Sequence, residues 1–160
     1  MSAKKKSAKT WNPVIALNHK ARHDYEVVET LEVGIVLLGT EVKSLRAGHL
    51  TFKDSYAMIR DGELWLYHLH INEYKQGNRF NHDPERPRKL LAHKREIERL
   101  HDKVKMLRFT LIPLKFYFKG NKVKIELGLC RGKTDIDRRE TLKERDAKRQ
   151  IEQAMKYRDR

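Results

Sequence analysis

The histidines and the single cysteine are the residues of this chain whose chemistry could support metal binding or catalysis. His68 and His70 stand two residues apart, so on a strand they would share one face and could hold a metal ion. No cysteine or further histidine stands at the spacing of a zinc site, and His82 falls in a polar stretch. We therefore predict two ordinary strand histidines and no metal site.

A second set of side chains could serve a ribonuclease, in which two acid–base groups flank a phosphate. His19, His23 and Glu32 are the candidates, and Asp24 directly follows His23. Adjacent side chains on an extended segment point to opposite faces, which argues against a pair between His23 and Asp24. Cys130 lacks a local activating motif and is predicted to be a packed strand residue.

These dispersed groups predict that the chain has no catalytic residues and is not an enzyme. The sequence also contains no phosphate-binding loop of the GxxxxGK[ST] type, so we expect neither a nucleotide-driven motor nor a cofactor. A ribonuclease or RNA-processing enzyme that uses histidine and glutamate as acid–base groups remains the alternative, and a ribosomal protein is a third possibility.

The distribution of charge gives the stronger indication of function. The chain has 36 Lys and Arg against 22 Asp and Glu, a formal charge of +14 over 160 residues. Cations gather at residues 1–11, Asn18–His23 and Arg86–Lys89, and the last thirty residues hold eleven Lys and Arg against seven Asp and Glu. Clustered cations are typical of proteins that bind polyanions, because neutralised phosphates release their counterions. The asparagine and histidine of the second cluster suit a folded RNA.

Composition sets the size and the setting of the protein. The length is that of one ordinary domain, and 39% hydrophobic residues predict a compact core with long tails. No stretch approaches the roughly 20 apolar residues of a membrane span, and no apolar segment follows the basic N-terminus as in a secretory signal. One cysteine excludes an intramolecular disulfide and fits a reducing cytoplasm. We expect a cytoplasmic monomer that does not bind membranes.

The hydrophobic pattern predicts mostly strands joined by tight turns. Alternating β-branched, aromatic and apolar residues predict strands at 25–38, 56–60, 63–67, 110–118 and 123–129. Asp61-Gly62 favours a tight hairpin turn, whereas Pro113 indicates an edge strand or a bulge. Strands so close in sequence favour an antiparallel sheet, and closing it into a small barrel of the OB type is the economical solution. A flat sheet with helices on one face is the alternative.

Two short helices and one long loop complete the predicted domain. Thr40 is expected to cap a helix over residues 41–47. A second helix is expected to present one apolar face made by Leu90, Leu91, Ile97, Leu100 and Val104. Residues 72–88 have no hydrophobic period and are predicted to form a polar loop.

The two ends of the chain differ from this middle part. Residues 1–12 are predicted to be a disordered basic arm, residues 13–130 the barrel, and residues 131–160 a basic tail. In the tail, Thr141 to Glu144 has the pattern of a capping box, and a thin apolar stripe follows at Ala147, Ile151 and Met155. Such a stripe gives little stability to an isolated helix, so we expect a tail that is disordered when free and helical when bound.

Eight short segments of the chain, in this order, resemble one known family. The segments are Ala16–Tyr25, Gly34–Leu37, Gly39–Arg46, Asp54–Tyr56, His82–Pro84, Arg88–Leu91, Pro113–Lys115 and Gly132–Lys133. The family is that of the SsrA-binding proteins, also called small protein B. The resemblance implies a bacterial cytoplasmic protein with an oligonucleotide-binding-fold barrel and no enzymatic activity.

The resemblance also implies a function and partners. The protein would bind the tRNA-like domain of transfer-messenger RNA and deliver it to ribosomes stalled on broken messages, in the process called trans-translation. Its tail would enter the vacant decoding site and messenger channel of the small subunit. Elongation factor Tu and alanyl-tRNA synthetase would act on the same RNA.

Matching the motifs residue by residue gives candidate contacts with RNA. The resemblance implies contacts at Asn18, Glu32, Leu91 and Lys122, and Glu32 is expected to orient a cation or to accept a hydrogen bond from a base or ribose. Charge and position add His19, Lys20, Arg22, His23, Arg86 and Arg88, with Arg79 as a weaker candidate. For the ribosome, the candidates are the tail residues Lys133, Asp137, Arg138, Arg139, Lys143, Arg145, Lys148, Arg149, Ile151 and Met155.

The chain departs from the pattern of this family at three positions. Thr134 stands where the family usually has a lysine, and Ile136 replaces an aromatic residue or histidine, which puts stacking of residue 136 on ribosomal RNA in doubt. Arg108 stands where a glycine is usual, and the sequence gives no reason for this difference.

Overall fold

The computed structural model of the chain describes residues 13–77 and 81–158, without the side chains of residues 135 and 136. The predicted arm at 1–12 and the candidate Arg79 lie outside the described residues. The strands are β1 (Val14–Leu17), β2 (Tyr25–Ile35), β3 (Leu50–Thr51), β4 (Tyr56–Arg60), β5 (Glu63–Tyr67), β6 (His70–Ile71), β7 (Arg88–Leu91), β8 (Thr110–Lys119) and β9 (Lys122–Gly132). The helices are α1 (His19–Asp24), α2 (Gly39–Arg46), α3 (Lys94–Leu107) and α4 (Asp135–Arg158). In the described part of the chain no helix is long and apolar enough to cross a membrane.

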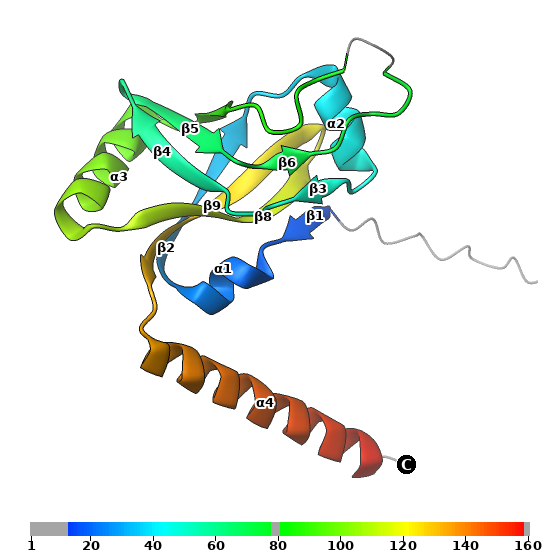
Figure 1. Cartoon of the computed structure of the whole chain (residues 1–160), viewed down its shortest axis with the longest axis vertical. Helices are drawn as coiled ribbons and strands as arrows, with labels where there is room; N and C mark the ends of the chain where they lie inside the picture. The colour runs from blue at the N-terminus through cyan, green and yellow to red at the C-terminus, as the bar shows by residue number, and fades with distance from the viewer. Residues whose placement is uncertain (1–12, 78–80, 159–160) are drawn as a thin grey trace, which may run out of the picture.

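The main sheet closes into a small antiparallel barrel (Figure 1). Its hydrogen-bonded order is β8-β4-β5-β7-β2-β9, and β9 pairs again with β8, so the ring has no free edge. Strand β1 adds to the outer side of this ring by pairing with β8, and β3 and β6 form a separate ribbon. The prediction of a small antiparallel barrel with short flanking helices is therefore confirmed, and the flat sheet is excluded.

The alternating pattern of the strands explains how the barrel holds together. Leu64 and Leu66 of β5, and Ile125 and Leu127 of β9, are buried, while the residues between them are not. Side chains of successive strand residues point to opposite faces, so each strand contributes every second residue to the core. The predicted Asp61-Gly62 turn is confirmed, with φ angles of 51° and 74° and a β4–β5 register from Tyr56–Tyr67 to Arg60–Glu63.

The predicted boundaries of one helix and of one strand need correction. Leu90 and Leu91 were predicted on a helix, but they belong to β7 and pair with β2 and β5, and the helix begins only at Lys94. The strand predicted over residues 25–38 ends at Ile35, and its register with β9 shifts between Val27 and Glu29. A short apolar run suits either structure, because periodicity alone does not separate a buried strand from one turn of helix.

The ends of α2 and α3 show local chemistry that the sequence suggested only in part. Thr40 does not cap α2; its hydroxyl contacts Nδ1 of His82 at 2.9 Å, and Glu41 accepts a hydrogen bond from the Leu38 N–H at 2.8 Å. Arg108 ends α3 in the left-handed conformation, with φ 52°. Glycine adopts this conformation at no steric cost, which explains why it is the usual residue there.

Pro113 lies inside β8, a strand with neighbours on both sides. The β8–β9 register shifts between Pro113 and Lys115, and the carbonyl of Pro113 accepts a hydrogen bond from Asn18. The predicted bulge is therefore confirmed, and it accommodates a residue without an amide hydrogen.

A buried ionic cluster fixes the loop between β6 and β7 onto α2. The Glu41 carboxylate is fully buried and accepts hydrogen bonds from Arg86 Nη2 at 2.7 Å and from Arg88 Nε at 2.8 Å. Arg88 also donates to the carbonyls of Leu69 and Pro84. Burial raises the pKa of Glu41, but the hydrogen bonds from Arg86 and Leu38 and the charge of Arg88 outweigh it, so the pKa lies below its ordinary value. The carboxylate is thus charged at neutral pH.

The tail begins where the barrel ends and forms one long helix. Strand β9 runs to Gly132, two residues beyond the predicted boundary, and α4 extends away from the barrel as a single rod (Figure 1). Every residue from 142 to 158 is exposed. That the tail orders only against a partner stays a prediction, and the exposure of α4 on all sides is in line with it.

We expect Glu41→Gln to lower the free energy of unfolding by about 3 kcal/mol at pH 7, because it leaves the buried guanidinium of Arg88 and the partly buried one of Arg86 without a countercharge. The difference from wild type should shrink as the pH falls below about 4.3, the pKa of an unfolded glutamate, since folding then requires a proton to leave Glu41. Urea unfolding between pH 3 and pH 8 measures both effects.

The matched control for this experiment is Glu63→Gln. Glu63 pairs with Lys89 at 2.9 Å, but both side chains are more than 40% exposed, so the change should cost less than about 0.5 kcal/mol. Equal losses in the two variants would contradict a special role of the buried cluster.

Candidate nucleic-acid interface

The first candidate surface is built on α1 and the start of the tail, and we call it the α1 surface. It comprises His19, Lys20, Arg22, His23 and Lys133, the four side chains of α1 being on its solvent side or partly exposed. Lys133 links the two segments, because its Nζ donates to the Arg22 carbonyl at 3.2 Å and to the Thr141 hydroxyl at 2.9 Å. The structure thus brings five sequence-predicted cations and histidines together.

Asn18, which precedes this surface, has its side chain committed inside the protein. It is 6% exposed, and its Oδ1 accepts from the Ala21 N–H at 3.0 Å as the N-cap of α1. Its Nδ2 donates to the Pro113 carbonyl at 2.9 Å. Asn18 therefore anchors α1 to β8, and a direct contact with RNA stays a prediction that this geometry does not favour.

His23 and Asp24 do form a pair, contrary to the argument from an extended segment. They lie at the end of α1, where His23 Nδ1 is 2.9 Å from Asp24 Oδ1, and this contact lowers the pKa of Asp24. Glu32 lies seven residues beyond Tyr25 along β2, about 20 Å away at the rise of a strand. His23 and Glu32 therefore do not flank one phosphate, which removes the geometric basis of the ribonuclease alternative.

The second candidate surface lies at the β8–β9 hairpin, and we call it the hairpin surface. It comprises Glu32, Leu91, Lys119, Lys122 and Lys124. Glu32 accepts hydrogen bonds from the Tyr117 hydroxyl and from Lys119 Nζ, the latter at 3.0 Å. These bonds lower the pKa of Glu32, while burial together with the Glu32 contact raises the pKa of Tyr117. A carboxylate on a surface that binds a polyanion is explained if it orients a neighbouring cation. Lys119 is that cation, and this is the role expected of Glu32 from the sequence.

Leu91 and Lys122 are both available to a ligand on this surface. Leu91 is 51% exposed on β7 opposite Gly34 of β2, where a Cβ on the glycine would come within 3.3 Å of the leucine. Lys122 is exposed beside the hairpin turn, paired with Lys119 across it. Gly34 has no Cβ, so Leu91 packs directly against the backbone of β2. Its exposed side chain is an apolar group on the same surface as the lysines.

The ladder between β2 and β9 separates the two surfaces. Tyr25 lies opposite Gly132 next to α1, and Gly34 lies opposite Lys124 near the hairpin. Nine residues of strand span about 25–30 Å, so the α1 surface and the hairpin surface lie at opposite ends of the same two strands.

Arg86 and Arg88 need a correction as candidate RNA contacts. Arg88 is fully buried, Arg86 is 27% exposed, and both hold the Glu41 carboxylate. A guanidinium already engaged with a buried carboxylate is not free for a phosphate, so these two arginines shape the fold. The sequence shows the cluster of cations but not its partner Glu41, which lies 45 residues before Arg86.

The remaining chemical candidates are also accounted for. His68 lies outside the strands with φ 61°, and His70 contacts Glu85 Oε1 at 3.3 Å, so the two histidines do not share a strand face. His82 is buried, with its Nε2 2.9 Å from the Ile71 carbonyl. Among the described residues no group of three or more histidine, cysteine and carboxylate side chains could hold a metal ion. Cys130 is buried as predicted, and burial raises its pKa to about 11, which makes the thiol inert.

The capping box of the tail helix lies seven residues before the one predicted at Thr141 to Glu144. Thr134 and Asp137 form the box: the Asp137 N–H donates to the Thr134 hydroxyl at 3.3 Å, and the Thr134 N–H donates to Asp137 Oδ2 at 3.1 Å. Thr141 lies within the helix and donates to the Asp137 carbonyl. Thr134, the residue that replaces a lysine of the family, is therefore a helix cap. Along the helix, the predicted ribosome contacts are exposed except Arg138, which is half-buried.

Sequence reasoning missed two members of the hairpin surface, Lys119 and Lys124, and also the Tyr117 hydroxyl that donates to Glu32. Tyr117 and Lys124 belong to predicted strands, and Lys119 lies one residue beyond the strand predicted over 110–118. The relation of all three to Glu32 depends on the β2–β9 and β8–β9 registers. The signal available was the alternation of lysines with apolar residues at the hairpin, which placed the lysines outside the core.

Three comparisons bear on this arrangement. The profile of a family described as SmpB protein matches residues 15–157. A protein of Carboxydothermus hydrogenoformans named SsrA-binding protein is 59% identical over 145 residues, which are 91% of this chain and 97% of that protein. A protein of the same name from Shouchella clausii is 52% identical over 151 residues, 94% of this chain and 97% of the relative.

A solved structure shares the fold. Its description is "tmRNA-SmpB: a journey to the center of the bacterial ribosome", and the matching chain is 53% identical with a TM-score of 0.66. The match covers 78% of this chain and 87% of that chain.

We expect Asn18→Ala to lower the free energy of unfolding by about 2 kcal/mol, because it removes a helix cap and a buried hydrogen bond of about 1 kcal/mol each. Asn18→Ser keeps an acceptor for Ala21 but loses the donor to Pro113, so it should cost about half as much. Chemical denaturation measures both. Unchanged stability in Asn18→Ala would contradict the role of this side chain as the anchor of α1 on β8.

Proposed function

The chain belongs to the SmpB, or SsrA-binding protein, family, and on this basis we propose that it is the RNA-binding adaptor of trans-translation. It binds the tRNA-like domain of transfer-messenger RNA and delivers this RNA to stalled ribosomes. The observation that carries the proposal is the extent of the match, which runs from residue 15 through the barrel to residue 157 of the tail. The family match therefore includes both the barrel and the tail helix.

The separation of the two surfaces supports the role of an adaptor. A protein that joins one RNA to another needs contacts at distinct places, and the β2–β9 ladder keeps the hairpin surface about 25–30 Å from the α1 surface and the start of α4. We assign capture of the tRNA-like domain to the barrel, with Lys122 contacting phosphate and Leu91 packing against RNA. The exposed tail helix then occupies the vacant decoding site and messenger channel.

The proposed role needs no catalytic group. The chain acts as a binding protein in the bacterial cytoplasm, as a monomer, alongside elongation factor Tu and alanyl-tRNA synthetase on the same RNA. No observation favours a second function, since the histidines and Glu32 that a ribonuclease would use are held apart along β2.

Lys122→Ala should weaken binding to a tRNA-like RNA and make it less sensitive to salt. The lysine is exposed, and removing one phosphate contact should reduce the slope of log K against log salt concentration by about 0.7–0.9. Binding titrations between 50 and 300 mM KCl measure the slope.

Lys105→Ala is the matched control, because Lys105 is an exposed lysine of α3, outside both surfaces. It should leave the slope within about 0.2 of wild type. If the two variants behave alike, the hairpin surface is not the phosphate-binding surface.

Removal of the tail should separate capture of RNA from action on the ribosome. A chain ending at Asp135 keeps the barrel, so its affinity for isolated transfer-messenger RNA should stay within about threefold of wild type. It should fail to support peptide tagging on stalled ribosomes, because nothing then fills the decoding site. Tagging in a reconstituted translation system is the measurement.

A double substitution tests whether the apolar stripe of α4 is needed. Ile151→Asp with Met155→Asp places charge on a stripe that is more than half exposed in the free chain, and should abolish tagging as the truncation does. Gln150→Asp with Gln153→Asp adds the same charge off the stripe and should retain most of the activity. Tagging at wild-type level by the truncated chain would refute the two-part mechanism.

A further inference from the structure

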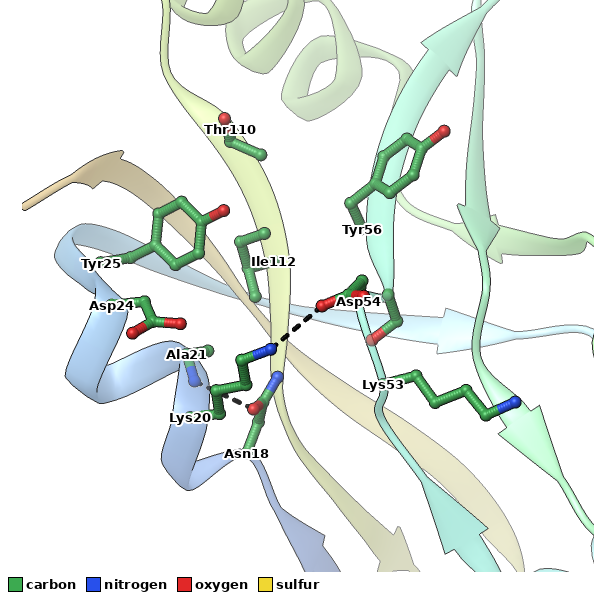
Figure 2. A pocket seen from close by; sticks show the side chains of 11 residues that line it. Asn18, Lys20, Ala21, Asp24, Tyr25, Lys53, Asp54, Tyr56, Thr110 and Ile112 are labelled. Carbon is green, nitrogen blue, oxygen red and sulfur yellow. Dashed lines mark hydrogen bonds and ion pairs between the residues drawn. The ribbon is translucent and has the colours of Figure 1, made fainter.

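A cavity of about 200 Å³ lies between α1, the loop before β4, and β8 (Figure 2). The lining residues on which the argument depends are Lys20, Tyr25, Asp54, Ser55, Tyr56 and Ile112. It is smaller than the roughly 300–1,000 Å³ of sites for drug-sized ligands, and it adjoins the α1 surface. A single planar ring is the size of group that such a space admits.

The walls of the cavity are aromatic and its floor is apolar. Figure 2 shows Tyr25 and Tyr56 on opposite sides, with Ile112 of β8 between them. The ring of Tyr56 is already fixed by stacking on Tyr67, with centroids 5.7 Å apart and planes at 24°. A planar group entering here would meet rigid aromatic surface, which costs little conformational entropy to bind.

The cavity also contains a hydroxyl group that the fold leaves unsatisfied. Ser55 is 3% exposed, and within the described part of the chain its Oγ has no hydrogen-bond partner. Buried polar groups are nearly always paired, so an unpaired one calls for an explanation. Thr110 brings a second hydroxyl to the same lining. A ligand that carries hydrogen-bonding atoms on the edge of a ring would pair with them.

An ion pair spans the opening of the cavity. Lys20 Nζ of α1 is 3.1 Å from Asp54 Oδ1, as the dashed line in Figure 2 shows, and the two side chains are 68% and 90% exposed. An exposed ion pair contributes little to stability, so a phosphate could take the place of Asp54 at Lys20. Lys53 extends away from the cavity and pairs with Glu85.

We propose that this cavity takes one unstacked nucleobase of the bound RNA, with the Tyr25 and Tyr56 rings beside it, the Ser55 hydroxyl on its edge, and its phosphate at Lys20. The proposal rests on the proposed function, since it assumes that the chain binds a folded RNA. The charges of the lining favour a base over a free anion, because Lys20 and Lys53 are balanced by Asp24 and Asp54. Single-stranded loops of RNA present such bases, and proteins recognise them by stacking and edge contacts.

The test removes bases one at a time from the RNA. A set of tRNA-like RNAs, each abasic at one unpaired loop position, is titrated against the wild-type protein and against Ser55→Leu, whose side chain fills the cavity. One abasic position should lower wild-type affinity about tenfold, in the range of base–aromatic stacking. Ser55→Leu should bind intact RNA about tenfold more weakly, and the same abasic position should then cost nothing further.

Ser55→Ala is the matched control, because it removes the hydroxyl and leaves the space open. It should lose about threefold in affinity, as for one hydrogen bond, and keep most of the penalty at the abasic position. Thermal unfolding of both variants checks that they fold. Ultraviolet crosslinking of the wild-type complex gives a second measurement that needs no variant, and the peptide crosslinked at that position should contain Tyr25 or Tyr56.

The outcomes separate the two proposals. If the wild-type protein binds the intact RNA but no abasic position couples to Ser55→Leu, or if the crosslink maps elsewhere, the nucleobase site is overturned and the adaptor function stands. If the wild-type protein does not bind the tRNA-like RNA, the proposed function fails, and the nucleobase site falls with it.

Discussion

The pairing of β2 with β9 is the constraint on which the rest of the molecule depends. It joins residues about a hundred positions apart in the chain, from Tyr25–Gly132 to Gly34–Lys124, and it closes the barrel. The same ladder sets α1 beside the first turn of α4 and sets Glu32 beside the cations of the β8–β9 hairpin. A shift of register by one residue would turn the core face of β2 outward. It would also move Glu32 away from the lysines of the hairpin surface.

A positive charge of this size does not translate directly into a binding surface. Arg88 is buried and Arg86 is partly buried, and both hold Glu41, whereas Lys119 and Lys122 of the hairpin surface are exposed to solvent. The difference follows from desolvation, since a buried cation needs a fixed countercharge and an exposed one does not. The acids are divided in the same way: Glu41 neutralises buried arginines, and Glu32 orients an exposed lysine.

Two of the three departures from the family pattern, Arg108 and Thr134, lie at the ends of helices. Arg108 accepts a left-handed conformation that glycine would adopt without strain, and Thr134 exchanges a cation for a cap at the start of α4. A capped helix that leaves the barrel directly after β9 gives the tail a defined starting direction, while its exposed length remains free to meet another surface. This division between a closed barrel and an exposed helix is what an adaptor between two RNAs requires.

The sequence by itself determined the five longest strands, the Asp61-Gly62 turn, the bulge at Pro113, the basic character and the family, because these depend on local pattern and short motifs. Tertiary structure alone decided that Asn18 donates to Pro113, that Arg88 is buried, and that Leu90 and Leu91 form a strand. It also brought Ser55, Tyr25 and Tyr56 around one cavity. Partners distant in sequence determine burial and hydrogen bonding, and a local pattern carries no information about which distant segment will supply them.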